Sequence, residues 1–304
     1  MSRPEVPARP DGRAVLIASL LAAFAALCWS GNHIVGRAIA GEVPPLAVGS
    51  IRWIIPALLL APFARPHLVR DWPEIKRTWP ALIVLSLVGG AVFGTLQYVG
   101  LTYTTALNVS VLNSVAPVFI VAAGWALFAD RVTLTQASGI AISFAGVLAI
   151  ITRGHPQALA SLGFNIGDLI ILFNMGLWAI YSASLRKRGN MHWVSFTFIL
   201  ACISAVVTLP FWLAEHMSGA VLRLTPASIA ALGYVALFPS LLAYVAWSRG
   251  VEILGSGRAG VFLHLIPIYS ALIAGAALGE RIEPYHFAGF ALILAGVWLA
   301  SRRG

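Results

Sequence analysis

The sequence predicts an all-α integral membrane protein, with ten transmembrane helices arranged as two inverted five-helix repeats around a central cavity. Three observations predict this class. Hydrophobic residues make up 59% of the 304 residues and charged residues only 10%, far below the charged quarter of a soluble chain. Apolar segments of about 20 residues, the length that crosses the hydrocarbon of a bilayer, follow one another along the chain. The third observation is an internal repeat.

The repeat relates residues 111–147 to residues 261–297 by a shift of 150 positions. The shared positions include prolines, arginines and glycines: Pro117 with Pro267, Arg131 with Arg281, and Gly139 with Gly289. Each copy holds an odd number of expected spans, so the second copy must enter the membrane in the opposite sense. Inverted repeats of this kind are typical of secondary transporters, which hold their substrate between the two copies.

Short polar segments that contain Gly or Pro separate the expected spans. We expect the spans at 14–38, 46–64, 79–100, 105–128, 133–152, 165–186, 192–213, 226–250, 256–279 and 284–302. The chain therefore divides into an N-terminal tail (1–13), a first five-helix repeat (14–152) and a second, inverted five-helix repeat (165–303). The linker between the repeats is too short to form a soluble domain.

Lys and Arg residues decide the expected orientation, because the cytoplasmic loops of membrane proteins carry an excess of them. With the N-terminus inside, the cytoplasmic segments hold fifteen of these residues, and the other side holds four, namely Arg37, Arg153, Arg223 and Arg281. We therefore expect both termini in the cytoplasm. The net charge of +9 follows from this topology, and the scattered basic residues do not indicate a nucleic-acid partner. A cleaved signal peptide is disfavoured because the first apolar run is long.

Polar and aromatic side chains inside the spans are the candidates for substrate binding, because polar groups in a membrane must face protein or a wet cavity. Several recur at helical spacing in both copies. The candidates are Trp29, Asn32, His33, Gln97, Tyr98, Asn108, Asn113, Asn174, Trp178, Tyr181, Ser240, Tyr244, Trp247 and His264. A cavity with these walls would suit a small, amphipathic organic solute. The alternative for any one of them is hydrogen bonding between helices.

Two prolines and one arginine are further candidates. Pro117 and Pro267 are expected to bend their helices around the central space and to free the carbonyls of Asn113 and Leu263 for solute. An ordinary packing kink is the alternative. Arg52 lies about two turns inside the second span, where it could either extend to the interface or contact an anion.

Other chemistry is not indicated. All Asp and Glu residues lie in tails, loops or span ends, so no carboxylate is placed to carry protons through the membrane, and proton coupling stays open. The match of residues 255–260 to a dinucleotide fingerprint lacks the required strand–helix context. No catalytic or nucleotide-binding motif was found, so we expect a protein that is not an enzyme and uses no metal and no cofactor.

The repeated segments resemble the signature of the drug/metabolite transporter superfamily, in its ten-helix EamA-type branch. The signature runs from Ala116-Pro-Val-Phe119 to Ala145-Gly-Val147 and again from Ile266-Pro-Ile-Tyr269 to Ala295-Gly-Val297. Trp29-Ser-Gly-Asn32, Arg52 and Gly167-Asp168 also fit, and the resemblance covers nearly the whole chain. Ala129-Asp130 stands where the family usually has Gly-Glu. The resemblance implies export of metabolites across the cell inner membrane without ATP, and it is strongest to bacterial exporters of aromatic and other amino acids.

These inferences leave competing functions. The leading hypothesis is a secondary transporter that exports amino acids, aromatic and other neutral ones, or similar small metabolites by alternating access. The alternative within the superfamily is an exporter of drugs or of other metabolites such as sugars or nucleosides, and a more distant one is a channel or membrane enzyme. The expected partners are a small-molecule substrate and the lipid bilayer. The oligomeric state stays open, and a monomer is compatible with the sequence.

Overall fold

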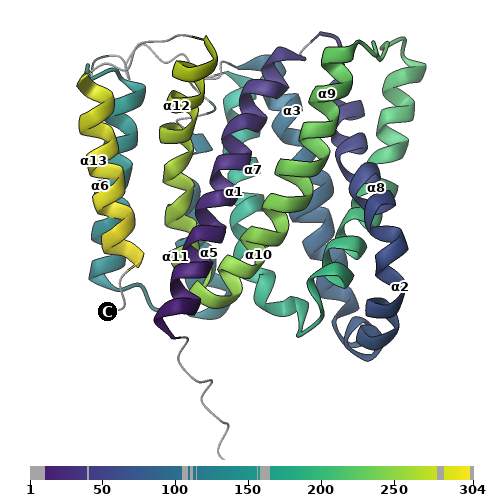
Figure 1. The fold of residues 1–304 in the computed structure, drawn as a ribbon, viewed down its shortest axis with the longest axis horizontal. Coiled ribbons are helices and arrows are strands. Elements are labelled where there is room, and N and C mark those ends of the chain that lie inside the picture. Colours follow the sequence, from purple (N-terminus) through teal and green to yellow (C-terminus); the bar gives the residue numbers. More distant parts are fainter. Residues whose placement is uncertain are drawn as a thin grey trace, which may run out of the picture.

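The computed structural model describes residues 11–39, 41–104, 109, 112–113, 115–155, 157, 165–278 and 284–301. All regular elements among these residues are helices, which stand side by side in one bundle (Figure 1). Within them, six helical stretches are long and apolar enough to cross a membrane, and three shorter apolar helices accompany them. The outer side chains are also apolar: Leu58, Phe63 and Phe173 are 68%, 65% and 62% exposed. Because such a surface is stable in lipid, the chain is a multi-pass membrane protein.

The elements follow the order of the predicted spans. The first half contains α1 (Gly12–Ala38), α2 (Pro45–Leu85), the π-helical segment η1 (Ser86–Val92), α3 (Phe93–Tyr103), α5 (Ala116–Phe128) and α6 (Leu134–Ile151). The second half contains α7 (Ile166–Ser184), the 3₁₀ turn η3 (Leu185–Arg188), α8 (Trp193–Met217), α9 (Pro226–Val235), the π-helical segment η4 (Ala236–Leu242), α10 (Ala243–Leu254), α11 (Ser256–Val261), the 3₁₀ turn η5 (Phe262–Leu265), α12 (Ile266–Leu278) and α13 (Pro284–Ser301). Part of the predicted fourth span lies outside the described residues.

The expected loop at residues 65–78 is wrong, because helical hydrogen bonding continues from α2 through η1 into α3. The stretch still reverses direction. Trp53 Nε1 donates to the Gly90 carbonyl at 3.1 Å, although 37 residues separate them, and a straight helix would place them about 55 Å apart. Helical turns satisfy the backbone at this bend, and Pro62, Pro66 and Pro73 lie within it.

Two π-helical segments occupy equivalent positions of the two halves, because η1 coincides with η4 after the shift of 150 positions. A π segment disturbs the α-helical ladder and frequently occurs at functional sites. The Gly89 carbonyl in η1 accepts a hydrogen bond from Tyr244 Oη at 2.5 Å, and the equivalent Pro239 carbonyl in η4 accepts one from Trp29 Nε1 at 3.0 Å. Each π segment therefore binds an aromatic side chain from the other half.

The two helices that end the sequence repeat, α6 and α13, pack against each other at one side of the bundle (Figure 1). They run antiparallel, because Gly139 lies against Gly296 whereas Gly146 lies against Gly289. A Cβ atom added at Gly146 would lie 2.7 Å from the Gly289 carbonyl oxygen. The glycines thus allow the close backbone approach that is common between membrane helices.

We call the end of the bundle at which α1 begins the N-end, and the end at which α1 finishes the opposite end (Figure 1). The fold-back of α2 meets the start of α8 at the N-end, where the Asn190 N–H donates to Glu74 Oε1 at 3.2 Å. At the opposite end, Glu215 of α8 accepts hydrogen bonds from the N–H groups of Leu46 and Ala47 at 3.2 and 3.0 Å. These bonds hold α2 against α8 at both ends.

Candidate functional site

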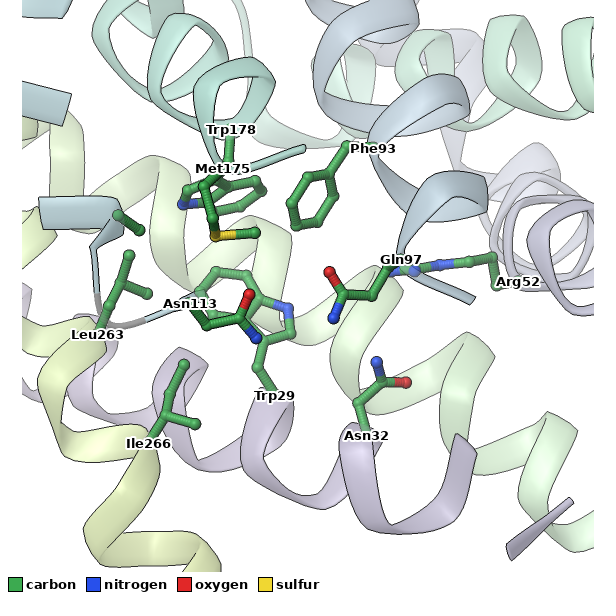
Figure 2. A pocket seen from close by; sticks show the side chains of 11 residues that line it. Trp29, Asn32, Arg52, Phe93, Gln97, Asn113, Met175, Trp178, Leu263 and Ile266 are labelled. Atoms are coloured by element: carbon green, nitrogen blue, oxygen red, sulfur yellow. The ribbon is translucent and has the colours of Figure 1, made fainter. Parts of the chain in front are cut away.

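A cavity at the centre of the bundle is the candidate solute site. It lies between α1, α2, α3, α5, α7, η5 and α12 and is lined by Trp29, Asn32, Arg52, Phe93, Gln97, Asn113, Ala116, Met175, Trp178, Leu263 and Ile266. Figure 2 shows the amides of Asn32, Gln97 and Asn113 around a shared space, with Phe93 and Trp178 beside it. The cavity has a volume of about 50 Å³, enough for roughly three to five water molecules. The free space at the centre of the bundle is therefore small.

Arg52 brings a positive charge to this cavity. Arg52 is 2% exposed, and its Nε donates to Ser240 Oγ at 2.9 Å. The guanidinium carbon lies 5.3 Å from the Trp53 ring centroid and 5.7 Å from that of Tyr98. Among the described residues, no carboxylate lines the cavity or forms an ion pair with Arg52. Extension of Arg52 to the membrane interface is therefore wrong, because α2 directs this side chain inward.

Neighbouring helices hold two of the cavity amides in place. Asn32 Oδ1 accepts a hydrogen bond from Tyr98 Oη at 2.7 Å, and Gln97 Oε1 accepts one from Asn174 Nδ2 at 3.2 Å. Asn174 Nδ2 also lies 3.1 Å from the Phe93 carbonyl. Asn32, Gln97 and Asn113 line the cavity as the sequence predicts, while Tyr98 and Asn174 stand behind these residues and orient them.

An aromatic layer, which consists of Trp178, Tyr181, Tyr244 and Trp247, closes the cavity toward the N-end. The ring centroids of Trp178 and Tyr181 lie 5.2 Å apart, and those of Trp178 and Trp247 lie 5.5 Å apart. Tyr181, Tyr244 and Trp247 are at most 2% exposed. Because α7 and α10 both run toward the N-end, Tyr181 and Trp247 lie farther along this direction than Trp178 and Ser240. Trp29 packs edge-on to Trp178, with centroids 5.0 Å apart.

The remaining predicted residues have other positions. His264 is fully buried outside the cavity lining, and its Nδ1 makes a hydrogen bond with Ser143 Oγ that joins η5 to α6. Ser240 contacts Arg52 rather than the cavity. Asn108 and the side chain of His33 lie outside the described residues.

Pro117 lies near the start of α5, whereas Pro267 follows η5 within the continuous helical stretch Ser256–Ile273. In the first turn of α5, the missing N–H of Pro117 has little cost. The Leu263 carbonyl accepts a hydrogen bond from the Ile266 N–H, so it is not the freed solute ligand that the sequence analysis expects. The helix geometry changes here, because the 3₁₀ turn η5 directly precedes α12.

Several lining residues carry no polar signal in the sequence, namely Phe93, Ala116, Met175, Leu263 and Ile266. Phe93 precedes Gln97 by four positions and Met175 precedes Trp178 by three, so each shares a helix face with a predicted residue. This spacing would have identified them. Arg52 was open to two interpretations, because its side-chain direction depends on the rotation of α2.

A bundle of membrane-spanning helices around a small cavity with a buried charge is the architecture expected of a membrane transporter. The chain belongs to the EamA-like transporter family, whose profile matches residues 16–152 and 165–302. It is therefore a member of the drug/metabolite transporter superfamily, and the resemblance seen in the sequence is confirmed.

Similar proteins agree with this class. A protein of Archaeoglobus fulgidus described as an uncharacterized transporter is 29% identical over 290 residues, which cover 93% of this chain and 97% of that protein. A probable amino-acid metabolite efflux pump of Salmonella typhimurium is 23% identical over 293 residues, with 92% and 93% of the two chains covered. A solved crystal structure with 18% identity has the same fold, with a TM-score of 0.75 over 93% of this chain and 96% of that chain.

Proposed function

We propose that the protein exports amino acids, aromatic and other neutral ones, or small metabolites of similar chemistry from the cytoplasm. The observation that carries this proposal is the buried Arg52 beside a cavity whose described lining contains no carboxylate. A buried guanidinium requires a counter-charge, and the carboxylate of an amino acid would supply it with charge-assisted hydrogen bonds. The name of the Salmonella relative supports the same class of solute.

The other walls of the cavity suit the remainder of an amino acid. Trp29, Phe93 and Trp178 offer apolar surface, and the amides of Asn32 and Gln97 offer hydrogen bonds. A cationic drug would meet the positive charge of Arg52 in surroundings of low polarity, where repulsion is strong. Sugars and nucleosides would leave Arg52 without a counter-charge. The charge of the site therefore favours amino acids over these alternatives.

We propose alternating access between two inverted repeats as the mechanism. The equivalent carbonyls of Gly89 and Pro239, and the antiparallel packing of α6 on α13, support a relation by inversion. Two such halves have two similar arrangements, each open to one side. The central cavity of about 50 Å³ is too small for an amino acid, so in this proposal the bundle widens at one end before solute enters.

We place the N-end in the cytoplasm and the protein in the cell inner membrane. Basic residues of the fold-back and of η3 lie at this end, including Arg70, Lys76, Arg77 and Lys187. A cytoplasmic excess of Lys and Arg is the usual determinant of orientation. Export would then start at the N-end and finish at the opposite end.

Counterflow in proteoliposomes tests the proposed function. Vesicles loaded with one unlabelled amino acid are placed in the same amino acid in labelled form, and the test is repeated for each of the twenty. We expect saturable accumulation of at least one neutral amino acid, and no competition by its methyl ester, which lacks the carboxylate. Absence of saturable flux for all twenty would reject the substrate class. Flux without saturation or counter-stimulation would indicate a channel.

A further inference from the structure

A second large cavity opens at the N-end, on the other side of the aromatic layer from the central cavity. It has a volume of about 500 Å³ and lies between η3 and the last turns of α10. Arg188, Ser248 and Glu252 are among its lining residues. We call this cavity the vestibule. It is ten times larger than the central cavity, so it can already admit a small solute in the observed state.

Arg188 is a buried cation in the wall of the vestibule. It is 6% exposed, and its guanidinium carbon lies 5.3 Å from the ring centroid of Phe196. Its Nη2 donates to Glu252 Oε2 at 2.6 Å. Its Nη1 is buried and has no hydrogen-bond partner in the described part of the chain. One terminal nitrogen of this guanidinium is thus paired and the other is not.

Two hydroxyl groups beside Arg188 are also buried. Ser248 Oγ and Tyr181 Oη are buried, and neither makes a hydrogen bond of standard geometry with the described residues. The two hydroxyls are close enough to interact with each other, and Tyr181 also interacts with Arg188, so the three polar groups form one cluster. A buried donor without a partner is rare in folded proteins, and the unpaired Nη1 of Arg188 beside two hydroxyls indicates a missing ligand that carries acceptor oxygens.

The charges around the cluster indicate the sign of that ligand. Glu252 serves two cations, because Arg249 Nη1 also donates to its Oε2 at 2.8 Å. Arg188, Arg249 and Glu252 together therefore carry one positive charge in excess. Arg186, which lines the same vestibule, is already neutralised by Asp130, whose Oδ1 lies 2.9 Å from its Nη1. The remaining charge calls for one anionic group.

We propose that Arg188, with the hydroxyl of Ser248, forms a second carboxylate site that binds the solute in the vestibule before it reaches the central cavity. This inference rests on the proposed function and adds a loading site on the N-end. Once the carboxylate binds Arg188, the Glu252 carboxylate faces the ammonium group of a neutral amino acid. The solute carboxylate would bind the unpartnered Nη1, and Arg188 Nη2 would keep its bond to Glu252.

Tyr181 connects the two sites. Its hydroxyl belongs to the cluster, while its ring packs on Trp178, which lines the central cavity. A small displacement of the aromatic layer would therefore open a route from Arg188 toward Arg52. The solute would meet one buried guanidinium on each side of the layer.

Transport kinetics measured separately from each membrane face test the loading site. Everted and right-side-out vesicles present opposite ends of the protein, and the probe is the neutral amino acid with the highest counterflow rate. In Arg188→Gln we expect the KM at the N-end face to rise about tenfold, the contribution of one charge-assisted hydrogen bond. The KM at the opposite face should stay within about twofold of the wild type. Lys76→Gln removes an exposed positive charge of the same face outside the vestibule and should change neither KM.

The outcomes separate this proposal from the proposed function. No amino-acid flux in the wild-type protein would reject the function itself. Wild-type flux with an unchanged N-end KM in Arg188→Gln, or with equal rises at both faces, would overturn the loading site alone. If Arg188→Gln does not fold, Arg188→Lys keeps the charge but loses the planar fork, and its N-end KM should rise by a smaller factor. An unchanged KM together with lost stabilisation by phosphatidylglycerol would assign the cluster to a lipid phosphate and would also overturn the proposal.

Discussion

For Arg52, the structure chose between the two positions that the sequence allowed. Its position two turns inside a predicted span allowed an interfacial side chain, but the structure buries it among Trp53, Tyr98 and Ser240. These neighbours supply aromatic faces and one acceptor, and none is negative. Because Arg52 forms no ion pair with the described carboxylates, it favours a solute that brings a carboxylate.

Substitution of Arg52 tests this role. In Arg52→Gln we expect kcat/KM for the transported amino acid to fall by about tenfold to a hundredfold, because the solute carboxylate loses a charge-assisted partner. Arg52→Lys should fall less, since it keeps the charge but cannot donate two parallel hydrogen bonds. Initial rates in proteoliposomes give the values, and thermal melting in detergent checks folding. A folded Arg52→Gln variant with wild-type KM would show that Arg52 does not bind the solute.

At the scale of the elements, α6 and α13 depend on glycine at their crossing. Gly146 faces Gly289 so closely that a Cβ atom would lie 2.7 Å from the carbonyl oxygen and 2.8 Å from the Ile293 nitrogen. Both neighbours are backbone atoms, which cannot move aside as a side chain would. Gly176 in α7 offers a contrast, because nothing lies within 4 Å of a Cβ atom added there.

We therefore expect opposite results from two identical substitutions. Gly146→Ala should lower the free energy of unfolding by about 1–3 kcal/mol through overpacking. Gly176→Ala should leave it unchanged or raise it by up to about 1 kcal/mol, because alanine is the better helix former. Denaturation in mixed micelles measures both. Equal stabilities of the two variants would contradict the close crossing of α6 and α13.

The start of α8 contains a titratable cap. His192 Nδ1 accepts a hydrogen bond from the Val194 N–H at 3.3 Å, and its ring stacks on His67 with centroids 4.0 Å apart. Burial, followed by the charges of His67 and Arg70, lowers the pKa of His192 below its ordinary value of 6.5. The folded state thus binds this proton more weakly than the unfolded state. The stability from the neutral cap is present above pH 6.5 and is lost as the pH falls below it.

Melting curves at two pH values test the cap. Between about pH 7.5 and about pH 5.5, the wild-type protein should lose about 1 kcal/mol more stability than His192→Asn. Asparagine keeps an acceptor at the N-cap but does not titrate. If both proteins lose stability in parallel, protonation of His192 has no part in the acid sensitivity of the fold.

At the scale of the whole molecule, equivalent helices of the two halves, such as α6 and α13, run in opposite directions. Leu134 begins α6 and Pro284 begins α13, and the sequence repeat of 150 positions aligns these two residues. Because α6 and α13 run antiparallel, their first residues lie at opposite ends of the bundle. Both residues are exposed, so both positions are open to labelling.

Single cysteines at these two positions test the arrangement in cells. In a background without Cys28 and Cys202, we expect Leu134→Cys to react with a membrane-impermeant maleimide only from the cytoplasm, and Pro284→Cys only from outside. Labelling of both from one side would contradict a membrane-spanning antiparallel pair. Labelling from opposite sides, but with the two compartments exchanged, would reverse the proposed orientation and the direction of export.

Much of the fold was predictable because hydrophobic length and repetition act locally along the chain. The apolar runs predicted most helix positions, and the shift of 150 positions predicted which helices correspond. The fold-back in α2 was not predictable in this way, since helical turns through Pro62 to Pro73 replaced the expected loop. The π character of η1 and η4 also had no local signal, because contacts with Tyr244 and Trp29 from the other half hold their carbonyls.

The candidate site was predictable in part. Helical spacing identified Trp29, Asn32 and Trp178, which line the cavity, but it could not separate them from Tyr181 and Trp247, which pack beneath it. All these residues are large or polar and have the same period. Only the rotation and depth of each helix decide whether such a side chain faces open space or another ring.

The amino-acid sequence by itself determined that this protein lies in a lipid bilayer, that it contains an internal repeat and which family it resembles. Hydropathy and residue spacing are properties of the chain alone. Tertiary structure decided where the buried charges lie. Arg52 and Arg188 come from segments far apart in the chain, and the surroundings of each exist only when separate helices meet: Arg52 contacts Ser240 of the other half, and Arg188 of η3 contacts Glu252 of α10. The sign and place of an electrostatic site depend on neighbours in space, which the order of residues does not specify.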